Sequence, residues 1–67
     1  SPRTSLTARE LDVLEASAQG LSNAQIAEFL VVSEATVKTH LSHIYTKLGV
    51  TSRSAAVAKA RDIGFIR

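Results

Sequence analysis

The sequence predicts an all-α fold, a compact four-helix domain formed by one chain of 67 residues. One pattern occurs three times: an apolar residue, a Ser or Thr, three further residues and a second apolar residue. It is found in LTAREL (6–11), LSNAQI (21–26) and VSEATV (32–37). Gly20, Gly49 and Gly64 each follow a helix-like stretch, at a place where chains often turn left-handed. No segment requires a strand.

The repeated pattern predicts where helices begin. Its Ser or Thr is expected to be an N-cap that accepts from a free backbone N–H, and its two apolar residues are expected to pack as a hydrophobic staple. Thr7 with Glu10, and Ser22 with Gln25, also have the spacing of capping boxes. With the glycines as stops, helices are expected at 8–19, 23–30, 34–48 and 53–63.

The apolar run from Leu30 to Val32 is expected to join the second helix to the third. Val32 precedes the Ser33 cap and is expected to pack on Val37 as the staple. Val31 lies in the turn, and because a β-branched residue resists positive φ, the turn is expected to be right-handed. A short strand is the alternative, since periodicity alone does not classify a short apolar run.

The third predicted helix has two different sides. At about 100° per residue, four apolar residues fall in one narrow sector that is expected to face the core. These are Val37, Leu41, Ile44 and Leu48. The opposite side is small and able to form hydrogen bonds, with one long cation; it consists of Ala35, Lys38, Thr39, Ser42 and Thr46.

This outward side predicts recognition of DNA. A helix about 10–12 Å across fits the major groove of B-DNA, which is about 12 Å wide. Lys38 is suited to guanine O6 or N7, the hydroxyls of Thr39 and Ser42 to polar base edges, and the methyls of Ala35 and Thr39 to a thymine methyl. Phosphate contacts are expected from helix N-termini and from nearby polar or basic side chains. These are Asn23, Ser33, Thr36, His43, Lys47 and Arg53.

Composition and charge favour binding over catalysis. Residues 1–34 contain five acids and two arginines, whereas residues 35–61 contain five basic residues and no acid, which indicates a half that faces a polyanion. A domain of this size buries only about 60% of its unfolded surface, so no deep catalytic cavity and no enzymatic activity are expected.

His40 and His43 lack further ligands nearby for a metal, and no cofactor is expected. Without a membrane-length apolar run or a signal peptide, a soluble, cytoplasmic protein is expected.

Four motifs together resemble the LuxR-type (GerE, NarL/FixJ-type) helix-turn-helix domain of bacterial transcription regulators. They are LT-x-RE (6–10), GLSN-x-x-IA (20–27), S-x-x-TVK-x-H (33–40) and KLGV-x-SR-x-x-A (47–56), within a resemblance that covers residues 6–66. Residues 6–67 are therefore expected to form one DNA-binding domain with its helix-turn-helix at about 23–42. Residues 1–5 are expected to be a linker remnant.

The resemblance implies that the third helix enters the major groove of double-stranded DNA. The family's base-contacting positions fall on Ala35, Lys38, Thr39 and Ser42. Its backbone-contacting positions fall on Asn23, Ser33, Thr36, Lys47 and Arg53.

The fourth helix is expected to pair two copies as a homodimer on DNA, through Ala55, Ala58 and Arg61. Such domains usually form the C-terminal output of a response regulator in a two-component system, or of a ligand-sensing regulator, behind an upstream receiver or sensor domain.

Some residues depart from the family pattern. Ala35 and Ser42 stand where many members carry longer side chains, so base readout is expected to depend on Lys38 and Thr39. Phe29 stands at a usually polar position and is expected to lie over the core edge, with contact to another domain as the alternative.

The fourth helix is expected to turn Ala56, Ala60 and Ile63 toward the core.

Two other functions are compatible with the sequence. One is DNA binding of the kind found in region 4 of sigma factors, whose helix-turn-helix begins with a similar LT-x-RE helix. The other is a helical protein-interaction module that docks a partner around Phe29 and the fourth helix.

Overall fold

Four helices joined by short turns make up residues 6–66, the part of the chain that this computed structural model describes. They are α1 (Ala8–Ala18), α2 (Asn23–Leu30), α3 (Glu34–Leu48) and α4 (Arg53–Asp62). The expected bounds of α2 and α3 are confirmed, and α1 and α4 each end one residue early. Residues 30–32 form no strand, so the strand alternative is wrong. The expected linker remnant at 1–5 lies outside the described residues.

The helix starts follow the predicted capping pattern. At each N-cap a hydroxyl oxygen accepts from the backbone N–H three residues later, and the N-caps are Thr7, Ser22, Ser33 and Ser52. Glu10 accepts from the Thr7 N–H at 2.9 Å and Gln25 accepts from the Ser22 N–H at 2.8 Å, which confirms both capping boxes. The pattern misses the cap at Ser52, because Thr51 rather than an apolar residue precedes it.

The helix ends share a second pattern. Each helix is followed by a residue with positive φ and then by an apolar residue whose N–H bonds to the carbonyl five residues earlier, which is a Schellman motif. The left-handed residues are Gly20, Val31, Gly49 and Gly64, and the apolar residues after them are Leu21, Val32, Val50 and Phe65. All four apolar residues pack in or against the core. Every turn is therefore closed by the backbone and anchored by a side chain.

Val31 shows that the prediction of a right-handed turn is wrong, since its φ is 58° and its ψ is 51°. The left-handed state costs a non-glycine residue about 1–2 kcal/mol. This conformation, however, lets the Val32 N–H reach the Ala27 carbonyl at 2.9 Å, and Val32 packs against the core. These contacts offset the strain at Val31, whose own side chain is left 89% exposed.

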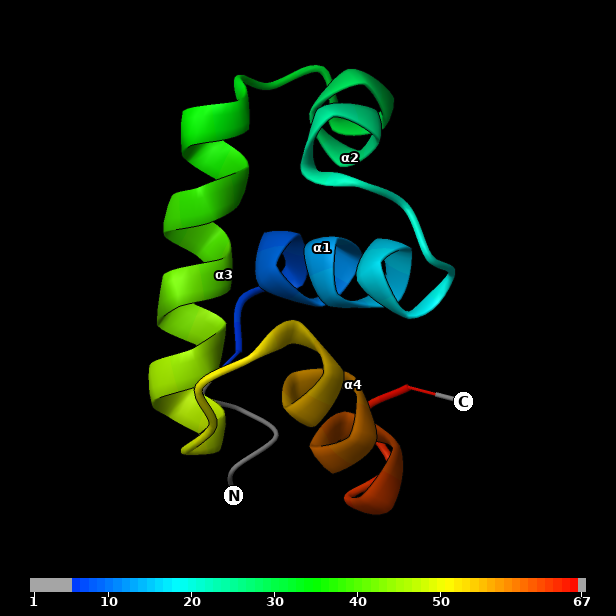
Figure 1. Ribbon diagram of the computed structural model, residues 1–67, viewed down its shortest axis with the longest axis vertical. Coiled ribbons are helices and arrows are strands. Elements are labelled where there is room, and N and C mark those ends of the chain that lie inside the picture. The colour runs from blue at the N-terminus through cyan, green and yellow to red at the C-terminus, as the bar shows by residue number, and fades with distance from the viewer. Residues whose placement is uncertain (1–5, 67) are drawn as a thin grey trace.

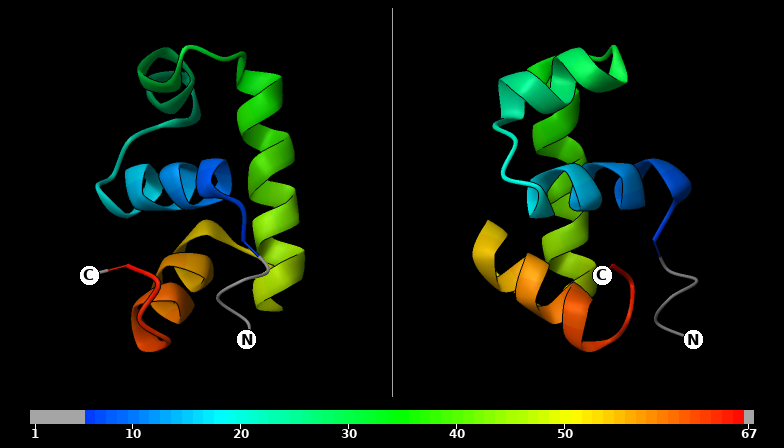
Figure 2. Two further views of the ribbon diagram at one scale, coloured as in Figure 1. Left: turned by 180° about the vertical axis from the view of Figure 1, so that it is seen from behind. Right: turned by 90° about the vertical axis from the view of Figure 1, so that its right-hand side faces the viewer.

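α3 lies along one side of the molecule, with α2, α1 and α4 arranged beside it from its N-terminal to its C-terminal end (Figures 1 and 2). Val37 and Ile44 of α3 have no exposed surface, and they belong to one buried cluster with Val13 and Leu14 of α1 and Ile26 of α2. Because α3 carries its partner helices on one side only, its other side faces solvent.

Phe29 does not lie over the core edge, because 73% of its surface is exposed. At roughly 100° per residue, Phe29 falls outside the sector of α2 that faces the core, which contains Ile26, Ala27 and Leu30. The prediction of a packed Phe29 is therefore wrong.

The contribution of α4 to the core differs from the prediction at one position. Ala56 and Ala60 are buried as expected, but Ile63 is 42% exposed. The reason is that α4 ends before Ile63, and the chain then turns at Gly64. This turn brings Phe65 into the core in place of Ile63.

Replacing Val31 with glycine is expected to stabilise the domain. Glycine removes the left-handed strain of about 1–2 kcal/mol, while its greater freedom in the unfolded chain offsets roughly 0.5–1 kcal/mol of that gain. The net change is expected to raise the free energy of unfolding by up to about 1.5 kcal/mol. Thermal unfolding followed by circular dichroism is expected to show a Tm several degrees above that of the parent.

The Gly49→Ala variant is the matched control. It places a Cβ on a residue with φ of 70°, with no atom beyond its chain neighbours within 4 Å, so the added strain is expected to outweigh the smaller entropy of the unfolded chain. Its Tm is expected to fall. A Val31→Gly variant that melts below the parent would contradict the account of strain at Val31.

Candidate nucleic-acid interface

The solvent-facing side of α3 carries the residues predicted to read bases. All four are exposed: Ala35, Lys38, Thr39 and Ser42. On the opposite side of the same helix, Val37 has no exposed surface and Leu41 is 5% exposed. The four exposed residues lie within about 100° of helical rotation. The structure therefore gathers them on one face that no other described helix covers.

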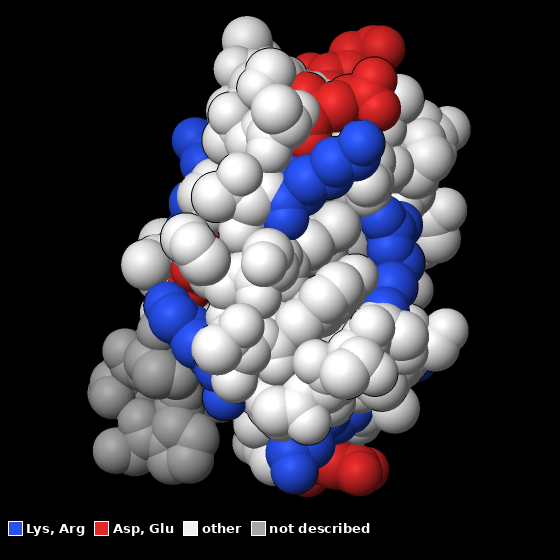
Figure 3. All heavy atoms as spheres, turned by 60° about the vertical axis from the view of Figure 1, so that its left-hand side comes forward, with Lys and Arg blue, Asp and Glu red and all other residues white. Residues whose placement is uncertain are grey.

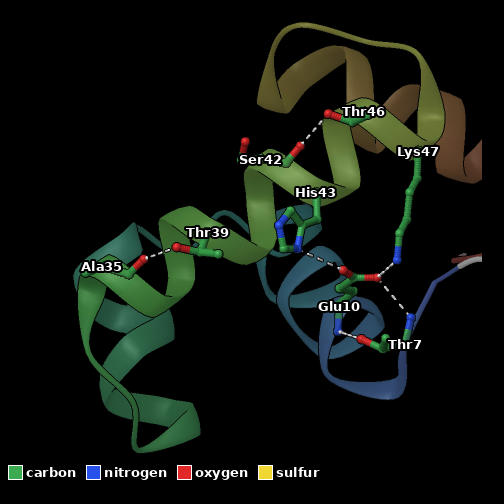
Figure 4. Close-up of polar contacts among 8 residues, drawn as sticks. All are labelled: Thr7, Glu10, Ala35, Thr39, Ser42, His43, Thr46 and Lys47. Atoms are coloured by element: carbon green, nitrogen blue, oxygen red, sulfur yellow. Dashed lines mark hydrogen bonds and ion pairs between the residues drawn. The ribbon is translucent and has the colours of Figure 1, made fainter.

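Some hydroxyl groups on this face bond to the helix itself (Figure 4). Thr39 Oγ1 donates to the Ala35 carbonyl at 3.0 Å, and Thr46 Oγ1 donates to the Ser42 carbonyl at 3.1 Å. While these bonds persist, each threonine oxygen can accept a hydrogen bond but has no proton left to donate. The Lys38 ammonium and the Ser42 hydroxyl bond to no described residue, so both are available to a ligand.

A pair of hydroxyls lies at the N-terminus of α3. Ser33 Oγ accepts from the Thr36 N–H at 3.1 Å and lies 2.9 Å from Thr36 Oγ1. Because the contact between the two oxygens uses only one of the two hydroxyl protons, the pair keeps one proton for an outside acceptor. The positive potential of a helix N-terminus favours an anion, such as a phosphate, as that acceptor.

Arg53 connects the start of α4 to the start of α2. Its guanidinium donates to the Leu21 carbonyl at 2.6 Å and to Asn23 Oδ1. Because the amide oxygen of Asn23 accepts from Arg53, the NH2 group of Asn23 is left to donate elsewhere. Arg53 therefore orients the Asn23 amide and also places a positive charge beside it.

Glu10 connects α1 to the C-terminal half of α3 (Figure 4). It is 3% exposed, its Oε1 accepts from Lys47 Nζ at 2.7 Å, and its Oε2 lies 3.7 Å from His43 Nδ1. Oε1 also accepts from the Thr7 N–H, as part of the capping box. Lys47 and His43, both predicted to contact phosphate, are thus held beside one buried carboxylate.

The contacts of Glu10 lower its pKa. Burial on its own raises the pKa of this carboxyl group, because it disfavours the charged form. The hydrogen bonds from Lys47 and from the Thr7 N–H, together with the Coulombic attraction of Lys47 and His43, outweigh burial and hold the pKa below its ordinary value. Glu10 is therefore a buried anion whose charge is stabilised by its partners.

The pair of Glu10 and Lys47 is a tertiary contact that sequence reasoning misses. The spacing assigns Glu10 only to the cap of α1, and the two partners are 37 positions apart. The periodicity of α1 does predict that Glu10 is buried, because Glu10 lies on the same side of that helix as Val13 and Leu14. A carboxylate on a buried side needs a cationic partner, but periodicity does not identify it.

The outer side of α4 combines small side chains with a shallow groove. Ala58 is exposed and Ala55 is half-buried. The groove, about 320 Å³ in volume, is lined by Ser17, Arg53, Ser54, Val57, Ala58 and Arg61. Two of the three residues predicted for pairing, Ala58 and Arg61, thus line the same groove.

Charge is unevenly distributed around the face that carries α3. Figure 3 shows basic side chains spread over this face, while most of the visible acidic side chains gather at the end where α2 meets α3. Glu28 and Glu34 are the exposed acids of that end. Within residues 6–66, no group of three or more His, Asp or Glu is placed to hold a metal ion, and no helix is long and apolar enough to cross a membrane.

Known sequences resemble this chain over most of its length. The family GerE, described as "Bacterial regulatory proteins, luxR family", matches residues 4–60. The nitrate/nitrite response regulator protein NarP of Escherichia coli (strain K12) is 58% identical over 55 residues, which are 82% of this chain and 26% of NarP. The quorum sensing-dependent transcriptional regulator RpaR of Rhodopseudomonas palustris is 45% identical over 65 residues, which are 97% of this chain and 27% of RpaR. The chain thus spans about a quarter of each of these curated relatives.

Two solved structures share the fold. The response regulator ChrA of a heme-sensing two-component system matches with a TM-score of 0.89 and 57% identity, over 91% of this chain and 30% of ChrA. The transcription factor GerE matches with a TM-score of 0.88 and 34% identity, over 92% of each chain. These matches confirm the four-helix fold and favour the luxR resemblance over the sigma-factor alternative.

Replacing Lys47 with methionine is expected to destabilise the domain at neutral pH. Methionine keeps an apolar stem but leaves the Glu10 carboxylate without its cation, at a cost of about 1–3 kcal/mol. Because the pKa of Glu10 is lowered in the folded state, its contribution is complete above the ordinary glutamate pKa of about 4.3. This contribution is lost as the pH falls through the lower folded value. Parent and variant are therefore expected to converge in stability in acid, as measured by urea unfolding at several pH values.

The Lys38→Met variant is the matched control, because Lys38 lies on the same helix and pairs with no described residue. Its stability is expected to stay within about 0.5 kcal/mol of the parent at every pH, as for ordinary surface changes. If the loss in Lys47→Met were the same in acid as at neutral pH, the pairing with ionised Glu10 would not be its cause.

Proposed function

The chain belongs to the luxR family of bacterial regulatory proteins, and from this premise we propose that it binds double-stranded DNA sequence-specifically as the DNA-binding domain of a transcription regulator. The observation that carries the proposal is the exposed, polar, sterically small face of α3, directly opposite its buried stripe. The family consists of DNA-binding regulator domains rather than enzymes.

In this proposal α3 is the helix that enters the major groove. Three of the four exposed residues predicted to read bases have small side chains, namely Ala35, Thr39 and Ser42. Small side chains let the helix backbone approach base edges closely, while Lys38 has the length and charge to reach guanine O6 or N7. Lys38 is free to do so, since it is not paired with any described residue.

We assign the grip on the DNA backbone to groups around the N-termini of α2 and α3. The hydroxyl pair of Ser33 and Thr36 keeps one proton to donate, and the NH2 group of Asn23 is left free by Arg53. His43 is 59% exposed at its side chain and Lys47 is 31% exposed, so both can contact a phosphate although Glu10 engages them, and Lys47 brings a positive charge to that contact. These contacts fix the position of the domain but carry no sequence information.

We also propose that two copies of the chain bind one two-fold operator through α4. The small residues Ala55 and Ala58, with Arg61 beside the groove, allow a second helix to approach closely. Sedimentation of the chain with operator DNA tests this pairing, because a complex that contains a single copy at saturating protein would refute it.

The proposal also covers the domain that would control this one in a longer regulator. Relatives such as NarP are about four times as long as the matched segment. We propose that this domain works in the cytoplasm as the C-terminal output of a response regulator or a ligand-sensing regulator, under the control of an upstream receiver or sensor domain. That placement would let a signal control access to α3 without any change inside the domain.

The chain is expected to bind duplex DNA with a strong dependence on salt. If each subunit neutralises three or four phosphates, the logarithm of affinity should fall against the logarithm of salt concentration with a slope near −3 per subunit. Fluorescence anisotropy with labelled mixed-sequence duplexes measures this slope. A chain that serves only to dock proteins would leave such duplexes unbound even in low salt, which would exclude the proposed function.

The Lys38→Ala and Asn23→Ala variants are both expected to bind DNA more weakly, but with different dependence on sequence. Loss of a base contact at Lys38 should cost about 1–3 kcal/mol on the selected site and relax specificity at one base pair. Loss of a phosphate contact at Asn23 should weaken selected and random duplexes alike. Lys59→Ala is the control, since Lys59 is an exposed cation on α4. Equal losses for Lys38→Ala on both kinds of duplex would argue against base reading.

A further inference from the structure

The hydroxyl of Thr39 is turned toward the backbone of its own helix. It donates to the Ala35 carbonyl at 3.0 Å, and the close-up shows its oxygen directed along the helix toward that carbonyl (Figure 4). To donate to a base, Thr39 would have to give up this bond. In its present state Thr39 offers the groove a methyl group and an oxygen that can only accept.

The neighbouring position has the same apolar character. Ala35 is exposed and its side chain is a single methyl group. The two residues are one helical turn apart on the same side of α3, and at about 1.5 Å of rise per residue they are separated by roughly 6 Å along the axis. This spacing is less than two base-pair steps of about 3.4 Å each.

Only one base displays an apolar group in the major groove. The C5 methyl of thymine is that group, whereas guanine, adenine and cytosine present only hydrogen-bonding atoms. A pair of methyl groups on the helix is therefore complementary to thymine. The methyls form no hydrogen bond with other bases, and the Thr39 oxygen can accept one only from the amino group of adenine or cytosine. Lys38, the one cation among the four residues predicted to read bases, is complementary to guanine.

On this basis we propose that α3 recognises thymine methyl groups through the methyls of Ala35 and Thr39, and that the Thr39 hydroxyl serves the helix rather than the base. The proposal rests on the proposed function and specifies its ligand. The expected half-site contains thymines within about two base pairs of one another, next to a guanine that contacts Lys38.

The first experiment removes the thymine methyl groups singly. Bound duplexes are selected from a random pool, and each thymine of the consensus is replaced by deoxyuridine, which lacks only the C5 methyl. Burial of one methyl predicts a loss of about 3- to 5-fold in affinity at each contacted thymine. Affinity is measured by fluorescence anisotropy with the complete 67-residue chain.

The second experiment separates the methyl of Thr39 from its hydroxyl. Thr39→Ser deletes the methyl and keeps the hydroxyl, so it should bind the selected site about 3- to 5-fold more weakly and lose the response to deoxyuridine at one thymine. Thr39→Val keeps a methyl and deletes the hydroxyl, so it should retain that response. Thr46→Val is the matched control, because it removes the same kind of backbone-directed hydroxyl two turns away. Circular dichroism checks that each variant keeps its helices.

The outcomes separate this inference from the proposed function. If the parent binds no duplex, both fall. If it binds DNA but the consensus lacks thymine, or no deoxyuridine substitution weakens binding, DNA binding stands and thymine recognition is refuted. Loss of the thymine response in Thr39→Val with retention in Thr39→Ser would assign recognition to the hydroxyl and would also refute the inference.

Discussion

Burial of one apolar stripe on α3 determines the orientation of the rest of the domain. A chain of 67 residues without cysteine must obtain its stability from packed side chains, and α3 supplies four of the buried ones. Because α1, α2 and α4 all pack on that stripe, the helix has no freedom to rotate about its axis (Figure 1). The polar side of α3 is therefore held in solvent by the same contacts that form the core.

Polar groups connect the helices at the margins of that core. Glu10 holds Lys47 and His43 against the start of α1, and Arg53 holds Asn23 and the carbonyl of Leu21 at the start of α2. These side chains therefore join helix packing to the positive charge around α3. Replacing one of them changes both properties, so binding data for such variants must be read together with stability data.

Local features of the fold were predictable, because they depend on residues within about five positions of one another. The caps at Thr7, Ser22 and Ser33 and the buried stripe of α3 are of this kind. The rest depends on tertiary contacts. The partner of Glu10 is far away along the chain, and the left-handed state of Val31 is stabilised by the burial of its neighbour Val32. The exposure of the four predicted base-reading residues followed from periodicity, whereas the hydrogen bond that Thr39 makes did not.

The way in which the four helices end has a consequence for association. The residue after each left-handed position is apolar and is packed in or against the core, so each connection between helices is tethered at its centre. Little conformational entropy remains in these connections for a ligand to remove. A rigid partner would meet a surface that is already ordered, so the entropy lost on binding by ordering loops would be small.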